Sequence, residues 1–428
     1  MIFETTKRKP DYILLAAIGA LVAVGLVMVY SASFVDAFMQ QENQFYYLFR
    51  QLTGACIGTV GMLVARRVNY TVWRRYSVHL MGLALILLML VLILPASMTM
   101  VNDSRSWIRY GAFSFQPSEF AKLALIVYFS DWLSRRGEKL NNVTYGLIPF
   151  GVMLGIVCGL VMLEPDLGTT VVLVMIAGMI YFAAGANLLH IGGAVGLAVI
   201  AFWVFIGLTG KVARIQAFQD PWKYYDTSGY QPVHALYALG SGGFFGVGLG
   251  QARQKFLWLP QAHTDAIFAI IGEELGLIGT LLVLGGFLLL AYRGFRIAGR
   301  APDPFATLVT VGITSWIVFQ ALLNIAVVTS LVPFTGITLP FLSYGSSSLM
   351  MCMIAMGVLL NISQHVRDRE TTRQSDSLAQ VIPQLQASLA AVPAWGRERW
   401  SRLWDTPHRS STRKRRTQQR RTGRTRLR

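Results

Sequence analysis

Long apolar runs recur along the chain from Tyr12 to Gln364, with polar or charged segments between them. A run of about 20 apolar residues can cross the hydrocarbon core of a bilayer as an α-helix. No long soluble domain intervenes before residue 365. The pattern therefore predicts an all-α polytopic membrane protein with about ten transmembrane helices.

Basic residues between the predicted helices orient them. By the positive-inside rule, Lys7–Lys9 and the arginines at 66–67, 74–75 and 135–136 lie in the cytoplasm. Both termini are then cytoplasmic, and segment 209–264, between the seventh and eighth helices, forms a large extracytoplasmic loop. The predicted helices cover approximately residues 12–32, 47–65, 78–96, 118–133, 145–163, a sixth ending at 185, 191–208, 265–292, 305–328 and 343–364.

Composition agrees with this reading and separates a tail from the membrane part. The chain is 54% hydrophobic and 14% charged, whereas soluble domains carry about 25% charged residues. Much of the net charge of +17 lies after His365. We therefore expect a transmembrane domain at 1–365 and a basic, partly disordered cytoplasmic tail at 366–428. Beside a membrane, anionic lipids are a simpler partner for this tail than nucleic acid, so no nucleic acid is expected.

The stretch Leu257–Gly279 is the strongest candidate for chemistry. A short polar loop ends at Asp265, and the apolar helix that follows carries Glu273 and Glu274. Ionisable groups at membrane depth are costly, and they usually mark a functional site. Asp265, at the outer end of this helix, is the first candidate.

Basic residues also occur on the predicted outer side, against the usual bias. Long loops cross membranes regardless of charge, or these side chains bind an anion at the outer leaflet, for which arginine is well suited. Both interpretations stay open at this point. The residues are Arg105, Arg109, Lys211, Arg214, Lys223, Arg253 and Lys255.

Three further polar groups have two interpretations each. Glu119 and Lys122 share one helix face, either as a structural ion pair or as one wall of a polar cavity. Glu164 and Asp166 flank a proline, in a plain turn or in the same cavity. The serines that begin at Ser343 either cap the last helix or direct backbone N–H groups at an anion.

Common catalytic signatures are absent from the sequence. It has no Gly-rich loop ending in Gly-Lys-Ser/Thr, no His-Glu-x-x-His, no Cys/His set with zinc spacing and no Gly-x-Ser-x-Gly. The three cysteines lie in apolar runs and are typical of packed core residues. The sequence therefore offers neither an ATP-driven motor nor a known hydrolase motif.

Several longer motifs carry a resemblance to a known family. They are Arg105-Ser106-Trp107-Ile108 followed by Gln116–Lys122, Glu164–Thr169, Gly229-Tyr230-Gln231 with 238–243 and 246–250, His263-Thr264-Asp265 with Gly272-Glu273-Glu274, and Asn324–Pro333 with Ser343-Tyr344-Gly345. On these motifs the chain up to residue 365 resembles the SEDS family (RodA, FtsW and SpoVE). Ser330, Phe334 and Ser346 depart from the family pattern, and Ser346 affects either local packing or the fit of the substrate. The sequence on either side of Asp265 and the basic tail resemble FtsW more than RodA.

The resemblance implies a peptidoglycan glycosyltransferase that polymerises lipid II at the outer face of the bacterial plasma membrane. Asp265 would act as the base of an inverting transfer. The leaving pyrophosphate would be held by Lys122, Arg109, Arg214 and Lys255, or by a divalent cation (Mg or Mn), although no cofactor is certain. His263 would orient Asp265 or bind phosphate. The remaining substrate-binding candidates are Trp107, Glu119, Glu164, Asp166 and Ser343.

The same resemblance implies partners and a setting. A class B penicillin-binding protein would supply crosslinking, together with other divisome or elongasome proteins, and cell division is the expected setting. Two other functions are open: a lipid II flippase and a non-catalytic division scaffold. The missing ATP motif and the lack of inverted repeats argue against a flippase, and a scaffold does not need Asp265 or the external cations.

Overall fold

The computed structural model describes residues 9–101, 104–110, 113–137, 140, 142–187, 189–190, 192–193, 196, 207 and 212–366. The chain divides into two units, Met1–Arg367 and Asp368–Arg428. The second unit, most of the predicted span 191–208, and Lys211 lie outside the described residues. The predictions made for them therefore stay predictions.

The described part of the first unit is built mainly from long apolar helices. Within it, six helical segments are long and apolar enough to cross a membrane: α1 (Tyr12–Gln41), α2 (Tyr46–Arg67), η2 with α7 (Val143–Leu147 and Ile148–Leu163), α12 (Ile267–Ala298), α13 (Pro304–Val328) and α14 (Ser346–Ser363). Shorter apolar helices are α4 (Ser77–Ile93) and α8 (Leu167–Ala183). α6 (Pro117–Ser134) is of similar length but includes Glu119, Lys122 and Asp131. The expectation of a multi-pass helical membrane protein is confirmed.

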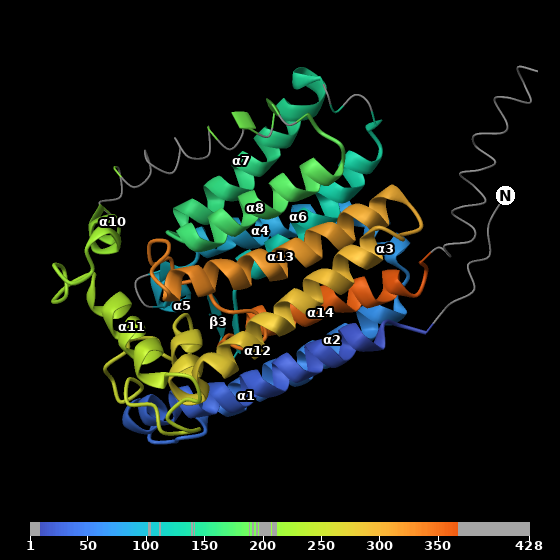
Figure 1. The fold of residues 1–428 in the computed structure, drawn as a ribbon. Helices are drawn as coiled ribbons and strands as arrows, with labels where there is room; N and C mark the ends of the chain where they lie inside the picture. Colours follow the sequence, from blue (N-terminus) through green and yellow to red (C-terminus); the bar gives the residue numbers. More distant parts are fainter. Residues whose placement is uncertain are drawn as a thin grey trace, which may run out of the picture. The chain divides into compact units, whose positions relative to one another are not determined.

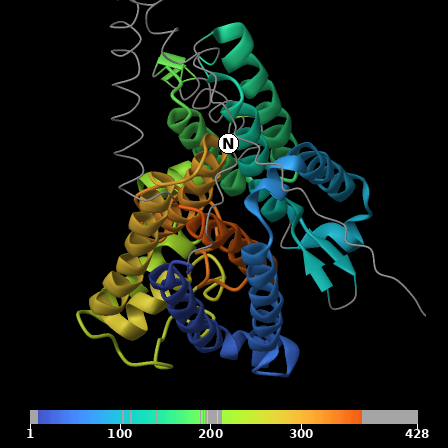
Figure 2. The same cartoon turned by 90° about the vertical axis from the view of Figure 1, so that its right-hand side faces the viewer.

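α13 and α14 form the centre of this bundle and are the most buried of the six segments. α14 packs along α2, and α13 contacts α12, α6 and α8 (Figure 1). Turned by 90°, the bundle has α1 and α2 at one edge and α7 and α8 at the opposite edge (Figure 2). Glycines allow a close approach of α2 and α14: a Cβ at Gly54 of α2 would lie 2.8 Å from the backbone Cα of Ser346 in α14. Small residues at such contacts let helix backbones meet without a large side chain between them.

Charged residues cap the helix ends that the sequence places in the cytoplasm and form ion pairs there. Asp11 caps α1, accepting from the Leu14 N–H at 3.0 Å, and it also pairs with Arg293 near the end of α12. Asp131 of α6 accepts from Arg74 at 3.0 Å and from Arg135 at 2.8 Å. The Asp11–Arg293 and Asp131–Arg74 pairs join helices that are far apart in sequence, whereas Arg135 lies four residues after Asp131 at the end of α6.

Short strands and helices occupy segments that the sequence predicted as loops. The loop before α6 contains two antiparallel hairpins, β1 (Met100–Val101) with β2 (Ser104–Arg105) and β3 (Ile108–Tyr110) with β4 (Phe113–Phe115). Each strand has only two or three residues, too few for a period-2 pattern to stand out. The further short helices are α3 (Tyr70–Arg75), α5 (Ala96–Thr99), α10 (Val212–Gln219) and α11 (Tyr230–Gly242).

The helix after Asp265 was predicted to be continuous, and this is wrong, because α12 breaks at Gly276, whose φ is 67°. Segment 243–250, here called the docked loop, lies against the break. Val247 N donates to Glu273 O at 2.9 Å, and Leu277 N donates to Gly243 O at 2.9 Å. A Cβ on Gly246 would collide with the Glu274 carbonyl. The docked loop thus replaces helical hydrogen bonds lost at the break and leaves residues 267–275, the outer segment of α12, as a separate short helix.

Candidate active site

Asp265 lies directly before α12 and is 8% exposed. Asn324 of α13 fixes its backbone: the amide Nδ2 donates to Asp265 O at 2.7 Å and to Ile337 O at 2.6 Å. The Thr264 hydroxyl donates to Asp265 Oδ1 at 3.1 Å. Gly336 has a φ of 69°, and a Cβ there would be 3.7 Å from Asp265 Oδ2. The carboxylate therefore lies where α12, α13 and the loop before α14 meet.

Burial raises the pKa of Asp265 to about 6. Hydrogen bonds from Thr264 and Gln231 and the positive charge of Arg214 act in the opposite direction and lower it. A carboxylate with this pKa is mostly ionised at neutral pH but is more basic than an ordinary aspartate. Such a group is suited to accept a proton from a hydroxyl, because a general base works best with a pKa near the ambient pH.

His263 is buried close to Asp265 and packs against two tyrosine rings. Its ring centroid lies 4.4 Å from that of Tyr47 and 5.5 Å from that of Tyr344. Its carbonyl accepts from Tyr344 N at 2.9 Å. Burial lowers the pKa of His263 to about 4, with Asp36 opposing the shift. The imidazole is therefore neutral at pH 7 and brings no charge to a phosphate.

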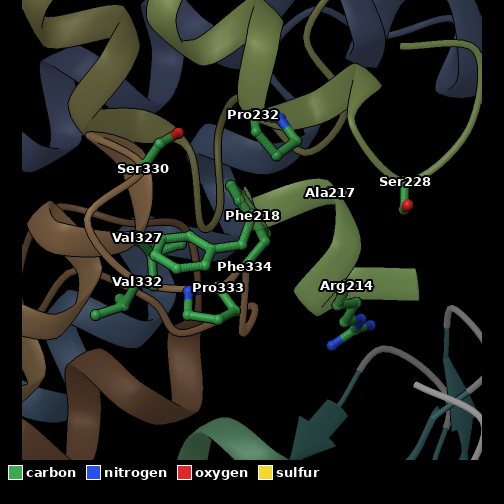
Figure 3. Close-up of a pocket in the computed structure, with 10 residues that line it drawn as sticks. All are labelled: Arg214, Ala217, Phe218, Ser228, Pro232, Val327, Ser330, Val332, Pro333 and Phe334. Atoms are coloured by element: carbon green, nitrogen blue, oxygen red, sulfur yellow. The ribbon is translucent and has the colours of Figure 1, made fainter. Parts of the chain in front are cut away.

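Arg214 of α10 is exposed and lies at the rim of a pocket beside this region. The pocket encloses about 290 Å³, including open solvent, and is also lined by Ser330, Pro333 and Phe334 (Figure 3). Ser330 and Phe334 are two of the positions where the sequence departs from the family pattern. Both residues line this pocket together with Arg214.

Lys255 was predicted to be an external cation that meets the substrate, but the structure buries it in an ion pair. Its Nζ lies 2.7 Å from Glu274 Oε1, with both side chains 0% exposed. Nζ also donates to Ser31 Oγ of α1 at 3.3 Å, and Ser31 donates to Glu274 at 2.6 Å. Glu273 next to it accepts from Arg253 N at 2.7 Å. The two glutamates thus join the outer segment of α12 to the preceding loop and to α1.

Lys122 and Glu119 form a second buried ion pair, with Nζ and Oε2 2.8 Å apart. Lys122 Nζ also donates to Gln320 Oε1 of α13 at 2.8 Å and lies 4.9 Å from the Trp316 ring centroid. Gln320 in turn donates to Thr338 O at 3.0 Å. Of the two interpretations, the structure has the ion pair, and the pair connects α6 and α13 to the loop that lies against Asp265.

Glu164 and Asp166 lie in the turn between α7 and α8. Burial raises the pKa of Glu164 to about 9, and the neighbouring Asp166 raises it further, so Glu164 is protonated at pH 7. Asp166 caps α8, accepting from Thr169 N at 2.9 Å and from the Thr169 hydroxyl at 2.8 Å. A Cβ on Gly168 would be 2.9 Å from Thr335 O, so this turn packs directly on the loop around Gly336.

The hairpin candidates lie on the outer side. Arg109 on β3 is exposed, and Trp107 just before β3 is half-buried. The hairpin is attached to α14 by Ser347, whose hydroxyl donates to Ser114 O at 3.0 Å. Arg109, like Arg214, is thus an exposed cation, and the hairpin that carries it is hydrogen-bonded to α14.

Ser343 acts within the loop before α14. Its hydroxyl accepts from Leu339 N at 2.7 Å, and its carbonyl accepts from Gln51 of α2 at 3.0 Å. Ser346, the residue that replaces a usual glycine, donates to Arg50 O at 3.0 Å. The serine is accommodated by a hydrogen bond between α14 and α2.

The amides of Gln51 and Gln320, the hydroxyl of Ser31 and the structural role of Asn324 were not predicted from the sequence. Each is a polar residue within an apolar run, which is itself a signal, because the bilayer offers no partner for it. Only Asn324 was named beforehand, as part of a motif. Among the described residues no three His, Cys, Asp or Glu side chains gather as metal ligands, and the divalent cation stays a prediction.

Comparisons with known proteins agree with this architecture. The FtsW/RodA/SpoVE family model, described as cell cycle protein, matches residues 12–368. Stage V sporulation protein E of Bacillus subtilis is 46% identical over 370 residues, covering 85% of this chain and 99% of the relative. A probable peptidoglycan glycosyltransferase FtsW of Trichlorobacter lovleyi is 42% identical over 364 residues, covering 83% and 95%.

A solved structure is also similar. It comes from work on the structural coordination of polymerization and crosslinking by a peptidoglycan synthase complex. Its chain matches with a TM-score of 0.68 and 25% identity, covering 84% of this chain and 99% of that one. The similarity therefore extends over nearly the whole described bundle.

Proposed function

Since the chain belongs to the FtsW/RodA/SpoVE family, we propose that it is a peptidoglycan glycosyltransferase that polymerises lipid II at the outer face of the bacterial plasma membrane. The FtsW relative's name supports the activity. The observation that carries the proposal is the position of Asp265, a buried carboxylate with a raised pKa at the outer end of α12.

The proposed reaction is a single displacement with inversion. Asp265 takes the proton from the acceptor 4-hydroxyl, and that oxygen attacks the anomeric carbon of the donor chain. The bond from this carbon to the pyrophosphate oxygen breaks, and the pyrophosphate leaves with the bonding electrons. It is a good leaving group without protonation, so no second carboxylic acid is required, unlike in glycosidases.

The charge that develops on the pyrophosphate needs cations that can reach it. We propose Arg214 and Arg109 for this role, because both side chains are exposed. Lys255 and Lys122 are reassigned to holding the site, because each is already paired within the fold. Glu119 is reassigned with Lys122, its partner in the buried ion pair. Contacts of Trp107, Glu164, Asp166, His263 and Ser343 with the sugar or peptide remain part of the proposal.

The proposal also covers the membrane topology of the enzyme, its partner protein and its cellular setting. Ten crossings with both termini in the cytoplasm fit the basic clusters of the sequence, with a tail at 366–428 that binds anionic lipids. A class B penicillin-binding protein is the proposed partner, supported by the similar chain from a synthase complex that combines polymerization and crosslinking. The named relatives support cell division or sporulation as the setting.

The test is polymerisation of lipid II by the purified protein in detergent, alone and with its penicillin-binding protein. Detergent removes the two compartments, so translocation has no meaning there and only a polymerase yields a product. Glycan strands are the expected result. No strands in either mixture, together with lipid II translocation in liposomes, would replace the enzyme with a flippase.

A further inference from the structure

The docked loop carries large apolar side chains that the protein leaves uncovered. Phe244 is 70% exposed and Phe245 is 83% exposed, and Leu249 is exposed beside them. An adjacent set of exposed aromatic and aliphatic residues on a loop usually marks a contact with another apolar partner. The depth of the loop in the bundle indicates which partner this is.

Helix α1, which is continuous, gives an estimate of that depth. Asp11 and Arg293 pair at the cytoplasmic end, and Ser31 and Glu274 bond at the outer end. At ~1.5 Å per residue, α1 rises roughly 30 Å from Asp11 to Ser31, which equals the thickness of the hydrocarbon core. The Ser31–Glu274 bond therefore marks the outer edge of the hydrocarbon.

The docked loop bonds to α12 below this edge. Ile278 N donates to Phe244 O at 3.3 Å. Ile278 lies about 22 Å from the level of Arg293 at the helical rise. Phe244 and its neighbour are thus placed several ångströms inside the hydrocarbon layer, although they belong to the segment that the sequence predicted to be external.

The surroundings of the loop suit an apolar solvent. The exposed side chains of α12 next to the loop are Leu277, Ile278, Leu281 and Leu282, the last 72% exposed. The apolar surface of the loop therefore continues the face that α12 turns to lipid. Non-helical backbone is tolerated at this depth when protein groups satisfy it, and the bonds of Val247 and Gly248 to the broken helix supply such partners.

We propose that the docked loop is re-entrant: it inserts into the acyl chains of the outer leaflet, with Phe244, Phe245 and Leu249 in direct contact with lipid. Because Glu273 holds both the docked loop and the segment leading to Asp265, the insertion fixes the height of the carboxylate above the bilayer.

The test measures depth directly with a spin label. Cys56, Cys158 and Cys352 are replaced by alanine, and a nitroxide is attached to Phe245→Cys in the full chain. The matched control is Met39→Cys, also apolar and 65% exposed, but about 12 Å beyond Ser31 along α1. Collision rates with oxygen and with a water-soluble nickel chelate are recorded in vesicles of phosphatidylethanolamine and phosphatidylglycerol.

The label at 245 should collide with oxygen and not with nickel, as a label at Leu282→Cys does, whereas the label at 39 should collide with nickel. A label at 245 that meets nickel as often as the label at 39 would place the loop in water. Shielding from both reagents would mean that another protein surface covers it. Either result overturns the proposal, and neither depends on glycosyltransferase activity.

Discussion

Two lysines and two arginines near the outer face have the same charge but different surroundings. Lys122 and Lys255 are buried in ion pairs with Glu119 and Glu274. Arg109 and Arg214 are exposed. The resemblance to the SEDS family implied that all four bind the pyrophosphate. Of these four residues only the arginines have exposed side chains, which supports the proposal that they bind the pyrophosphate while the lysines hold the site in place.

The hydrogen bonds and ion pairs of Lys255 and of Lys122 each lead to an element that supports Asp265. Lys255 reaches it through Glu274 and the outer segment of α12, and Lys122 reaches it through Gln320 and the loop at Thr338. A buried ion pair adds little stability over an apolar pair of the same shape, but loss of one partner is severe. The networks therefore matter mainly for geometry.

Among substitutions of these four residues, Lys255→Met should have the largest effect. It leaves Glu274 charged and buried, which costs roughly 3–5 kcal/mol, so both thermal stability and polymerisation should fall sharply. Scanning calorimetry and a lipid II assay measure the two. Lys255→Met with Glu274→Gln is the matched control and should recover most of the stability. A single variant as stable as wild type would show that the pair does not hold the outer segment of α12.

Lys122→Met should also lower thermal stability and polymerisation. The loss of stability should be somewhat smaller than for Lys255→Met, because Glu119 is slightly more exposed than Glu274. Adding Glu119→Gln removes the unpaired charge and should restore stability. Thermal denaturation of the single and double variants gives their coupling. Additive effects would mean that the two residues do not depend on one another.

Arg214→Gln should leave stability unchanged, since surface substitutions usually alter it by less than about 0.5 kcal/mol. Loss of a phosphate contact should raise KM for lipid II by about tenfold, equivalent to ~1.4 kcal/mol. Lys223→Gln, also an exposed residue of the outer segment, is the control. A KM of Arg214→Gln equal to that of the wild type would remove Arg214 from the substrate site.

The smallest expected effect is on the pH dependence. The base must be ionised, so kcat/KM of the wild type should rise with pH and level off above about 6, the pKa of Asp265. The Arg214 charge lowers that pKa, and Arg214→Gln should therefore move the midpoint to higher pH, while Lys223→Gln should not. An unmoved midpoint in both variants would separate Arg214 from the carboxylate.

The helices and Asp265 were accessible from the sequence because each has a local signal. Apolar length indicates a span, and an acid at a span end is conspicuous. The ion pair of Lys255 had no such signal, because its partners Ser31 and Glu274 are 224 and 19 residues away. The break in α12 was hidden as well, since a single glycine in an apolar run is compatible with a helix, and the docked loop that satisfies it comes from another segment.

The most direct test of the account compares Asp265→Asn with wild type in two measurements on the same preparation, lipid II binding and glycan formation. Asparagine keeps the shape of the side chain but cannot take the proton. We expect unchanged affinity for lipid II and no glycan strands, with the protein folded. Glycan strands at a rate near that of wild type would contradict the assignment of Asp265 as the base.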